Sequence, residues 1–246
     1  MPDFDSRWIV PDWPAPPRVR ALITTRAGGV SLAPYRSLNL GTRVGDEPAA
    51  VAENRRRVRV HLPAEPRWLE QVHGNRAVDA KTIESPIAAD AAYTDTPGVV
   101  CTVMVADCLP ILLCDMAGRH VAVAHAGWRG LASGVAEAAI AGLGLPPSQL
   151  MAYLGPAIGP RAFEVGAEVR EAFVDADPAA DAAFAAQAPG KWIADLCLLA
   201  RQRLARAGIE HVYGGGLCTY SEPTRFFSHR RDKVSGRMAA FIWLTP

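Results

Sequence analysis

The sequence predicts an α+β fold, a single domain of mixed β-sheets with flanking helices. Apolar runs of strand length outnumber segments with helical spacing, and they follow one another as hairpins instead of alternating with helices in regular βαβ units. No repeat and no linker divides the 246 residues, a length that one large domain can fill. Five prolines within residues 1–17 predict an extended arm, so we expect the single domain to span residues 18–246.

The first third of the chain contains two predicted strands and one predicted helix. Residues 18–25 alternate in polarity and predict a strand, and residues 68–72 predict a shorter one. Residues 51–62 have helical spacing that ends before Pro63, with a basic face that we expect in solvent. The arginines of this face are Arg55, Arg56, Arg57 and Arg59. Residues 77–97 are mixed and predict no definite element.

The centre of the chain predicts a hairpin whose register can be stated. Residues 99–106, 109–114 and 120–126 are apolar runs of strand length, and residues 115–119 form a polar break with a glycine that is typical of a turn. If Asp115 pairs with His120, then His125 lies opposite Pro110 and Gly127 lies opposite Cys108. Diagonal neighbours across a strand pair are about 7–8 Å apart. Cys108 and His125 therefore share the open end of this hairpin.

The remaining elements alternate between helices and short strands. A helix is predicted from Trp128 to Gly144, followed by a strand at residues 151–154 and a rigid loop at 155–160. Residues 165–176 and 196–207 have helical spacing, and the alanine-rich segment between them predicts a surface helix and a loop. Residues 212–219 and 238–244 predict strands, separated by a polar loop at 226–232.

Composition excludes several classes of function. The net charge of +1 gives no electrostatic basis for binding nucleic acid or an anionic membrane, and no apolar stretch is long enough to span a bilayer. The N-terminus lacks the basic start and apolar core of a signal peptide. The five scattered cysteines form no CxxC pair and indicate a reducing compartment, so we expect a cytoplasmic protein. Cys101, Cys114, Cys197 and Cys218 are interpreted as small buried hydrophobic residues.

Three short motifs supply metal donors at the ends of apolar runs. They contain His73 in QVHG, Cys108 in ADC and His125 in AHAGWRG. Two imidazoles and one thiolate are a common donor set for a catalytic zinc, which keeps three protein ligands and one open position. The hairpin brings Cys108 and His125 together, whereas His73 cannot be placed by local geometry.

A second set of residues suggests an anion site. Arg26 precedes Gly28-Gly29, whose backbone N–H groups could cradle an anion, and Arg129 follows His125 at a predicted helix start. Arg230 lies in the loop FFSHRRD, and guanidinium groups suit phosphate or carboxylate. Asp107 beside Cys108 is either a general acid or base, or a carboxylate that caps a turn.

The order of the motifs TTRAGGVS, YRSLNLGTRVGD, WLEQVHG, ADCLPILLCD, AHAGWRG, YLGPAIGP and FFSHRRD resembles that of the YfiH-like laccase-domain family, also called the multicopper polyphenol oxidase family. The resemblance implies a fold similar to the catalytic domain of cytotoxic necrotizing factors, and a zinc held by His73, Cys108 and His125. It implies a purine nucleoside phosphorylase for adenosine, inosine and 5′-methylthioadenosine, with adenosine deaminase activity. Asn39 and Gln71, within these motifs, are then expected to bind substrate with Arg26, Arg129 and Arg230.

Two other functions stay open, as does the oligomeric state. Members of the family have also been called peptidoglycan-editing factors, and Cys108 with His125 as its base could form a metal-free amide hydrolase. Others have been called polyphenol oxidases, but six histidines are too few for a multicopper site, which leaves one copper in the zinc site as the possibility. A further alternative is a non-catalytic, metal-dependent binding protein. Its structural zinc would need Cys101 or Cys114 as fourth ligand, and Cys114 is a poor one because it is expected about 20 Å along the strand from Cys108.

Overall fold

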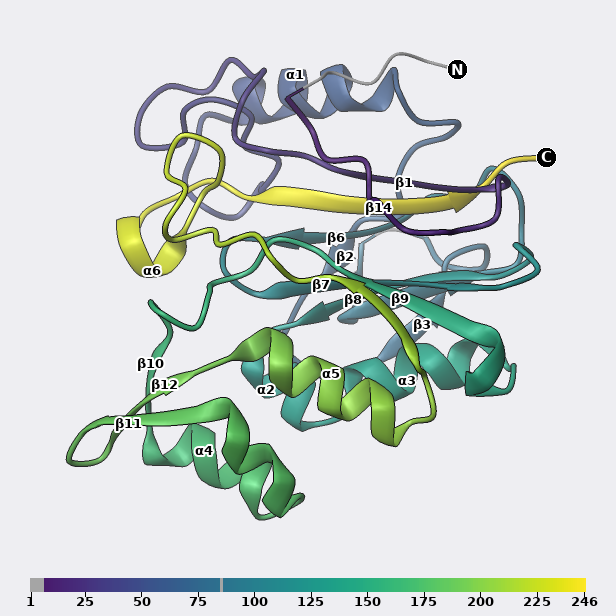
Figure 1. Cartoon of the computed structure of the whole chain (residues 1–246). Helices are drawn as coiled ribbons and strands as arrows, with labels where there is room; N and C mark the ends of the chain where they lie inside the picture. Colours follow the sequence, from purple (N-terminus) through teal and green to yellow (C-terminus); the bar gives the residue numbers. More distant parts are fainter. Residues whose placement is uncertain (1–6, 85) are drawn as a thin grey trace.

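The computed structural model describes residues 7–84 and 86–246, which form stacked layers of helices and mixed β-sheets (Figure 1). Two sheets face each other in the middle. The larger has six strands in the order β13-β9-β7-β8-β5-β3, and the smaller has three in the order β1-β14-β6. The six are β3 (Ala77–Asp79), β5 (Ala91–Thr94), β7 (Leu109–Asp115), β8 (Val121–Ala126), β9 (Leu150–Leu154) and β13 (His211–Gly214). The three are β1 (Val19–Ile23), β6 (Cys101–Val105) and β14 (Met238–Leu244).

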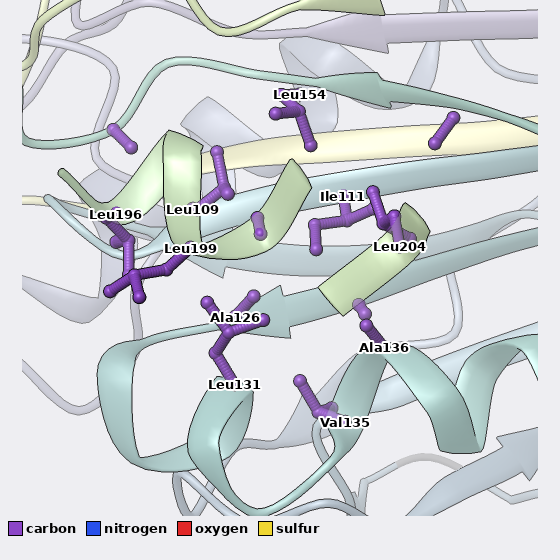
Figure 2. Close-up of a cluster of buried hydrophobic side chains, with 14 of the residues drawn as sticks. Leu109, Ile111, Ala126, Leu131, Val135, Ala136, Leu154, Leu196, Leu199 and Leu204 are labelled. Carbon is purple, nitrogen blue, oxygen red and sulfur yellow. The ribbon is translucent and has the colours of Figure 1, made fainter. Parts of the chain in front are cut away.

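Helices cover the outer faces of both sheets. Helix α1 (Pro48–Arg59) packs on the three-stranded sheet, and α2 (Trp128–Ala132), α3 (Val135–Leu143) and α5 (Leu196–Arg206) pack on the six-stranded sheet (Figure 1). Strand β7 lies between two apolar cores, and all seven of its residues are buried. Its Leu109 and Ile111 point to the core beneath α2, α3 and α5 (Figure 2), whereas Leu112 points to the core between the sheets. This explains why β7 is a continuous apolar run.

Smaller elements complete the structure. A three-stranded sheet of β10 (Glu164–Gly166), β12 (Lys191–Ala194) and β11 (Phe184–Ala188) lies with α4 (Ala167–Val174) at the lower left of Figure 1. Strands β2 (Leu69–Glu70) and β4 (Ile87–Ala88) form a parallel pair. The short helix α6 (His229–Asp232) precedes β14, and 3-10 turns lie at Pro147–Gln149 and Pro178–Ala183.

The predicted hairpin is confirmed in its register. Pro110 pairs with His125 and Leu109 with Ala126 in the antiparallel ladder of β7 and β8. At the other end the backbone N–H of Asp115 donates to the carbonyl of His120. The Asp115 carboxylate closes the turn by accepting hydrogen bonds from the N–H groups of Arg119 and His120, at 2.6 and 2.7 Å.

Four predicted elements differ from the structure. The helix expected from Trp128 to Gly144 is broken into α2 and α3 at Gly134, whose φ of 95° lies outside the right-handed helical region. The strand expected at 212–219 ends at Gly214, since both Gly214 and Gly215 have positive φ. Residues 226–232 contain helix α6, capped by Ser228, instead of only a loop. The alanine-rich segment forms a 3-10 turn and the hairpin of β11 and β12 instead of a surface helix and loop.

The basic face of α1 is only partly solvated. Arg56 and Arg57 pair with Glu53, but the Arg55 guanidinium lies 3.8 Å from the centre of the Trp68 ring and its Nε donates to the Leu40 carbonyl. The prediction that Arg55 lies in solvent is therefore wrong, because Trp68 supplies an apolar face on which the planar guanidinium stacks.

The N-terminal arm and the cysteines can be compared with their predictions. Residues 1–6 of the arm lie outside the described residues, and further along Ile9 pairs with Ile23 while the Trp13 ring lies 5.9 Å from that of Tyr153. The domain boundary at residue 18 stays a prediction. Cys101 and Cys114 are buried as expected, whereas Cys197 and Cys218 are half-buried. Among the described residues, no helix combines the length and the apolar character of a membrane span.

Candidate metal centre

The open end of the β7–β8 hairpin brings two of the predicted ligands together. Cys108 immediately precedes β7, and His125 is the penultimate residue of β8. Gly127 lies beside Cys108, as the register predicts, and a Cβ atom at Gly127 would stand only 2.8 Å from the Cys108 Sγ and 3.2 Å from the His73 ring. Glycine at this position therefore leaves the space that the thiol and the imidazole occupy.

His73 completes the group from the loop between β2 and β3. Its Nε2 lies 3.9 Å from the Cys108 Sγ, and its ring centre lies 4.8 Å from that of His125. The φ of His73 is 59°, an uncommon value for a residue with a side chain. The ligand atoms of the three residues all lie within 4.8 Å of one another. The tertiary structure thus brings together the trio that the sequence motifs predict.

Asp90, which the sequence analysis missed, connects the two histidines. Its buried carboxylate lies 2.8 Å from the Nδ1 of His125 and also accepts the backbone N–H groups of Val72, His73 and Gly74, at 3.1, 3.0 and 2.8 Å. Its carbonyl oxygen accepts the N–H of His125 at 2.7 Å. The only signal in the sequence was an acidic residue between the alanines that precede β5.

The charged forms of Cys108, His125 and Asp90 stabilise one another. Burial alone would raise the pKa of the Cys108 thiol, but the His125 and His73 imidazoles lower it below its usual value. Burial alone would lower the pKa of His125, but the Cys108 thiolate and the Asp90 carboxylate raise it. Burial would likewise raise the pKa of Asp90, but hydrogen bonds from His125, Gly74 and Val72 lower it. Without a metal, the structure therefore favours a thiolate beside an imidazolium.

The donor set fits a metal ion with an open position. Zn–S and Zn–N bonds of about 2.3 and 2.0–2.1 Å place the S and N atoms of a tetrahedral site about 3.6 Å apart, close to the 3.9 Å between Cys108 and His73. The Asp90 carboxylate accepts a hydrogen bond from the Nδ1–H of His125, which leaves the Nε2 lone pair for a metal. Within the described part of the chain these three residues form the one candidate group, without a fourth protein ligand. That coordination is typical of catalytic and not of structural zinc.

A large cavity opens onto the trio. Its volume is about 990 Å³, at the upper end of the range of about 300–1,000 Å³ for ligand pockets. Besides the trio it is lined by three pairs of an arginine and an aromatic ring, one of which is the Arg55–Trp68 pair described above. The Arg129 guanidinium lies 4.3 Å from the centre of the Trp128 ring, and the Arg230 guanidinium lies 5.3 Å from that of Phe163. The cavity therefore offers flat apolar surfaces and positive charge next to a metal site.

Comparison with known proteins places this site in a family. The chain matches the family described as "Multi-copper polyphenol oxidoreductase laccase" over residues 20–245. The chain belongs to this family. It is 56% identical over 240 residues to "Purine nucleoside phosphorylase PA4543" of Pseudomonas aeruginosa, covering 97% of this chain and 99% of that protein. It is also 56% identical over 244 residues to "Purine nucleoside phosphorylase YfiH" of Escherichia coli, with the same coverage.

Solved structures show the same fold. The crystal structure of the Neisseria meningitidis protein NMB0706 has a TM-score of 0.95 and 52% identity, and covers 98% of this chain and 100% of that one. The structure of YlmD from Geobacillus stearothermophilus has a TM-score of 0.91 and 34% identity, with coverage of 99% and 98%. The predicted resemblance to the YfiH-like laccase family is confirmed.

Asp107, a candidate catalytic residue, and the predicted substrate-binding residues divide into two groups. Asp107, Gln71, Arg129 and Arg230 line the cavity. Both oxygens of the Asp107 carboxylate accept hydrogen bonds at 2.6 Å, from the Thr219 hydroxyl and from the Arg230 N–H. The Gln71 amide is bound at both ends to the backbone of Met104, at 2.8 Å each. Asp107 and Gln71 therefore hold the walls of the cavity in place.

Arg26 and Asn39 lie outside the lining of the cavity. The Arg26 guanidinium donates to the carbonyls of Arg36 and Pro223 and stacks on Phe227. Asn39 is fully buried, and its amide bonds to Asp46, Gly41 and the N–H of Arg237. Both residues have structural contacts that a local motif cannot distinguish from ligand contacts.

Proposed function

We propose that this protein is a zinc-dependent purine nucleoside phosphorylase that acts on adenosine, inosine and 5′-methylthioadenosine. The observation that carries the proposal is the 56% identity, over almost the whole chain, to relatives that bear the name purine nucleoside phosphorylase. The cavity supports it, since it combines aromatic surfaces suited to a base with cations suited to phosphate. In this proposal the partners are a nucleoside and phosphate, without nucleic acid or membrane, in the cytoplasm.

The reaction would use the cavity residues as follows. Arg129 and Arg230 bind inorganic phosphate, whose oxygen attacks C1′ of the ribose while the bond from C1′ to the base breaks. The base leaves with the proton that the attacking hydrogen phosphate gives up, and ribose 1-phosphate remains. The sequence left Asp107 open between a general acid or base and a turn-capping carboxylate; because its oxygens accept two hydrogen bonds in the structure, we assign it to positioning Arg230. His73, Cys108 and His125 would hold the zinc, which supplies a Lewis acid when bound.

Phosphate dependence tests this function directly. With adenosine or inosine, we expect free base and ribose 1-phosphate in equal amounts, and turnover should depend on the phosphate concentration. Chromatography of the products, with and without phosphate, measures both. Turnover at the same rate without phosphate would contradict the phosphorylase and indicate hydrolysis. Inosine formed from adenosine would report separately the adenosine deaminase activity that the family resemblance implies.

Replacing Arg129 should weaken phosphate binding selectively. The Arg129 side chain is exposed, lines the cavity and stacks on the Trp128 ring, and among the described residues its guanidinium makes no hydrogen bond or ion pair, so it is available for an anion. Loss of a charge-assisted hydrogen bond of about 1.5–3 kcal/mol lowers kcat/KM for phosphate about ten- to hundredfold in Arg129→Ala. Arg129→Lys should retain only part of the kcat/KM for phosphate, because an ammonium lacks the planar, forked geometry of a guanidinium. Unchanged phosphate kinetics with unchanged metal content would show that Arg129 merely packs on Trp128.

A metal-free amide hydrolase is the second candidate, because Cys108 and His125 form a thiolate–imidazolium pair. This reading goes with the predicted likeness to necrotizing factors and with editing of a peptidoglycan precursor. Chelation separates the two candidates, since amide hydrolysis that persists in full after removal of the metal would favour the hydrolase. Copper at the same three donors would instead suit a polyphenol oxidase, and metal analysis of the purified protein distinguishes copper from zinc.

A further inference from the structure

Three residues other than glycine have positive φ in the described part of the chain, and all three line the same cavity. They are His73 at 59°, Asp107 at 89° and Lys233 at 61°. Such conformations cost energy and concentrate at functional sites, where the surrounding structure maintains them. His73 belongs to the metal centre and Asp107 holds Arg230. Lys233 is the third, and neither the motifs nor the proposed reaction uses it.

The backbone at Lys233 adopts a rare turn. Its φ of 61° and ψ of −56° are close to those of the classic γ-turn, and the N–H of Val234 donates to the carbonyl of Asp232 at 2.7 Å, which closes the three-residue ring. This conformation is strained for any residue with a Cβ atom, and glycine would adopt it more easily. A lysine here is therefore not the choice that backbone geometry favours.

The segments on both sides of the turn hold it in place. Before it, the Arg231 guanidinium donates to the carbonyls of Thr219, Tyr220 and Phe226. After it, the backbone N–H of Arg237 donates to the side-chain oxygen of the buried Asn39, at 2.8 Å. The turn is thus fixed against the body of the protein, so the side chain at 233 starts from a defined point on the cavity wall.

The charge of Lys233 has no counter-ion within residues 7–84 and 86–246. Its neighbour Asp232 pairs with Arg231 through both carboxylate oxygens, at 2.8 and 2.7 Å, and is therefore already neutralised. Among the described residues, the Lys233 ammonium makes no hydrogen bond or ion pair. It lines a cavity that also contains Arg129 and Arg230. An unpaired cation in such surroundings favours an anionic ligand.

We propose that Lys233 binds the phosphate group of a ligand in this cavity, and that its strained turn is kept because it directs the ammonium there. This inference rests on the proposed function for the identity of the ligand. The phosphate group can come from two sources, the inorganic phosphate of the phosphorylase reaction or the 5′-phosphate of a nucleotide. The cavity is large enough to accept a nucleoside and a phosphate group together.

Four variants separate charge from strain in the metal-loaded enzyme. Lys233→Arg keeps both, Lys233→Ala removes the charge but keeps the strained turn, and Lys233→Gly removes both. Lys191→Ala removes an exposed lysine on β12, which does not line the cavity, and serves as the control. Binding of inorganic phosphate, AMP and adenosine is measured by calorimetry, and unfolding is followed by heating.

We expect phosphate binding to weaken about tenfold or more in Lys233→Ala and Lys233→Gly, and to change little in Lys233→Arg and Lys191→Ala. Lys233→Gly should unfold at a higher temperature than Lys233→Ala, because only glycine relieves the turn. A loss confined to inorganic phosphate assigns Lys233 to the co-substrate, and a loss confined to AMP assigns it to a nucleotide. In either case adenosine binding should stay unchanged.

Equal binding of both phosphate probes by wild type and Lys233→Ala would overturn the proposal. A merely structural lysine would alter the unfolding temperature without altering phosphate binding. Because calorimetry detects binding without turnover, an enzyme that binds phosphate through Lys233 but cleaves no nucleoside would contradict the proposed function and leave this inference standing.

Discussion

Cys108→Ala should lose most of its bound metal while keeping its fold. The thiolate is one of three ligands, and the remaining His73 and His125 cannot hold zinc firmly by themselves. A catalytic metal contributes several kcal/mol to transition-state stabilisation, so nucleoside cleavage should fall by about a thousandfold or more. Metal analysis of the purified variant, circular dichroism and product chromatography measure the three quantities.

Cys197→Ala provides the matched control for Cys108→Ala. Cys197 is a half-buried thiol at the start of α5 that does not line the cavity, so its loss should leave metal content and activity intact. Full metal occupancy in Cys108→Ala would contradict the assignment of the metal centre. Full occupancy together with complete loss of activity would instead identify Cys108 as the nucleophile of the alternative hydrolase.

Replacing Asp90 should weaken metal binding although Asp90 is not a ligand. In Asp90→Asn an NH₂ group replaces one carboxylate oxygen, and it faces N–H groups of the 72–74 loop or the hydrogen of His125. Hydrogen-bond partners of metal ligands typically contribute about 10–100-fold to metal affinity, which competition with a chelator measures. Asp90→Ala leaves the buried donors unpaired and should lower the free energy of unfolding by about 3–5 kcal/mol.

Asp115→Asn is the control that separates the effect of Asp90 on the position of the metal ligands from its effect on the stability of the fold. Asp115 is also buried and also accepts hydrogen bonds from two backbone N–H groups. It lies at the turn of the β7–β8 hairpin, at the opposite end from His125. The Asp115→Asn variant should be less stable than wild type but should bind metal with the same affinity. Equal metal affinities in Asp90→Asn and wild type would show that Asp90 only stabilises the fold. Because the folded pKa of Asp90 is below its usual value, its stabilising effect is present at neutral pH and is lost as the pH falls through that pKa.

Local patterns predicted the elements whose geometry is set by neighbours in the chain. The β7–β8 hairpin was predicted with its register because polar turn residues and two apolar runs fix the pairing. The break between α2 and α3 was not predicted, because an isolated glycine among alanines is tolerated within a helix and the choice depends on packing. The expectation that Arg55 lies in solvent was wrong for the same reason, since the ring on which it stacks belongs to Trp68, in a separate segment of the sequence.

The sequence by itself determined the donor atoms of the candidate site, the hairpin that joins Cys108 to His125 and, through its motifs, the family. Only the tertiary structure decided which side chains surround these atoms. Asp90 binds the segments of His73 and His125, 17 and 35 residues away along the chain, Arg26 donates to backbone carbonyls, and the unpaired Lys233 lies on the cavity wall. The physical reason is that backbone pairing follows short-range patterns, whereas the partner of a buried charge or a surface cation is fixed by packing between distant segments.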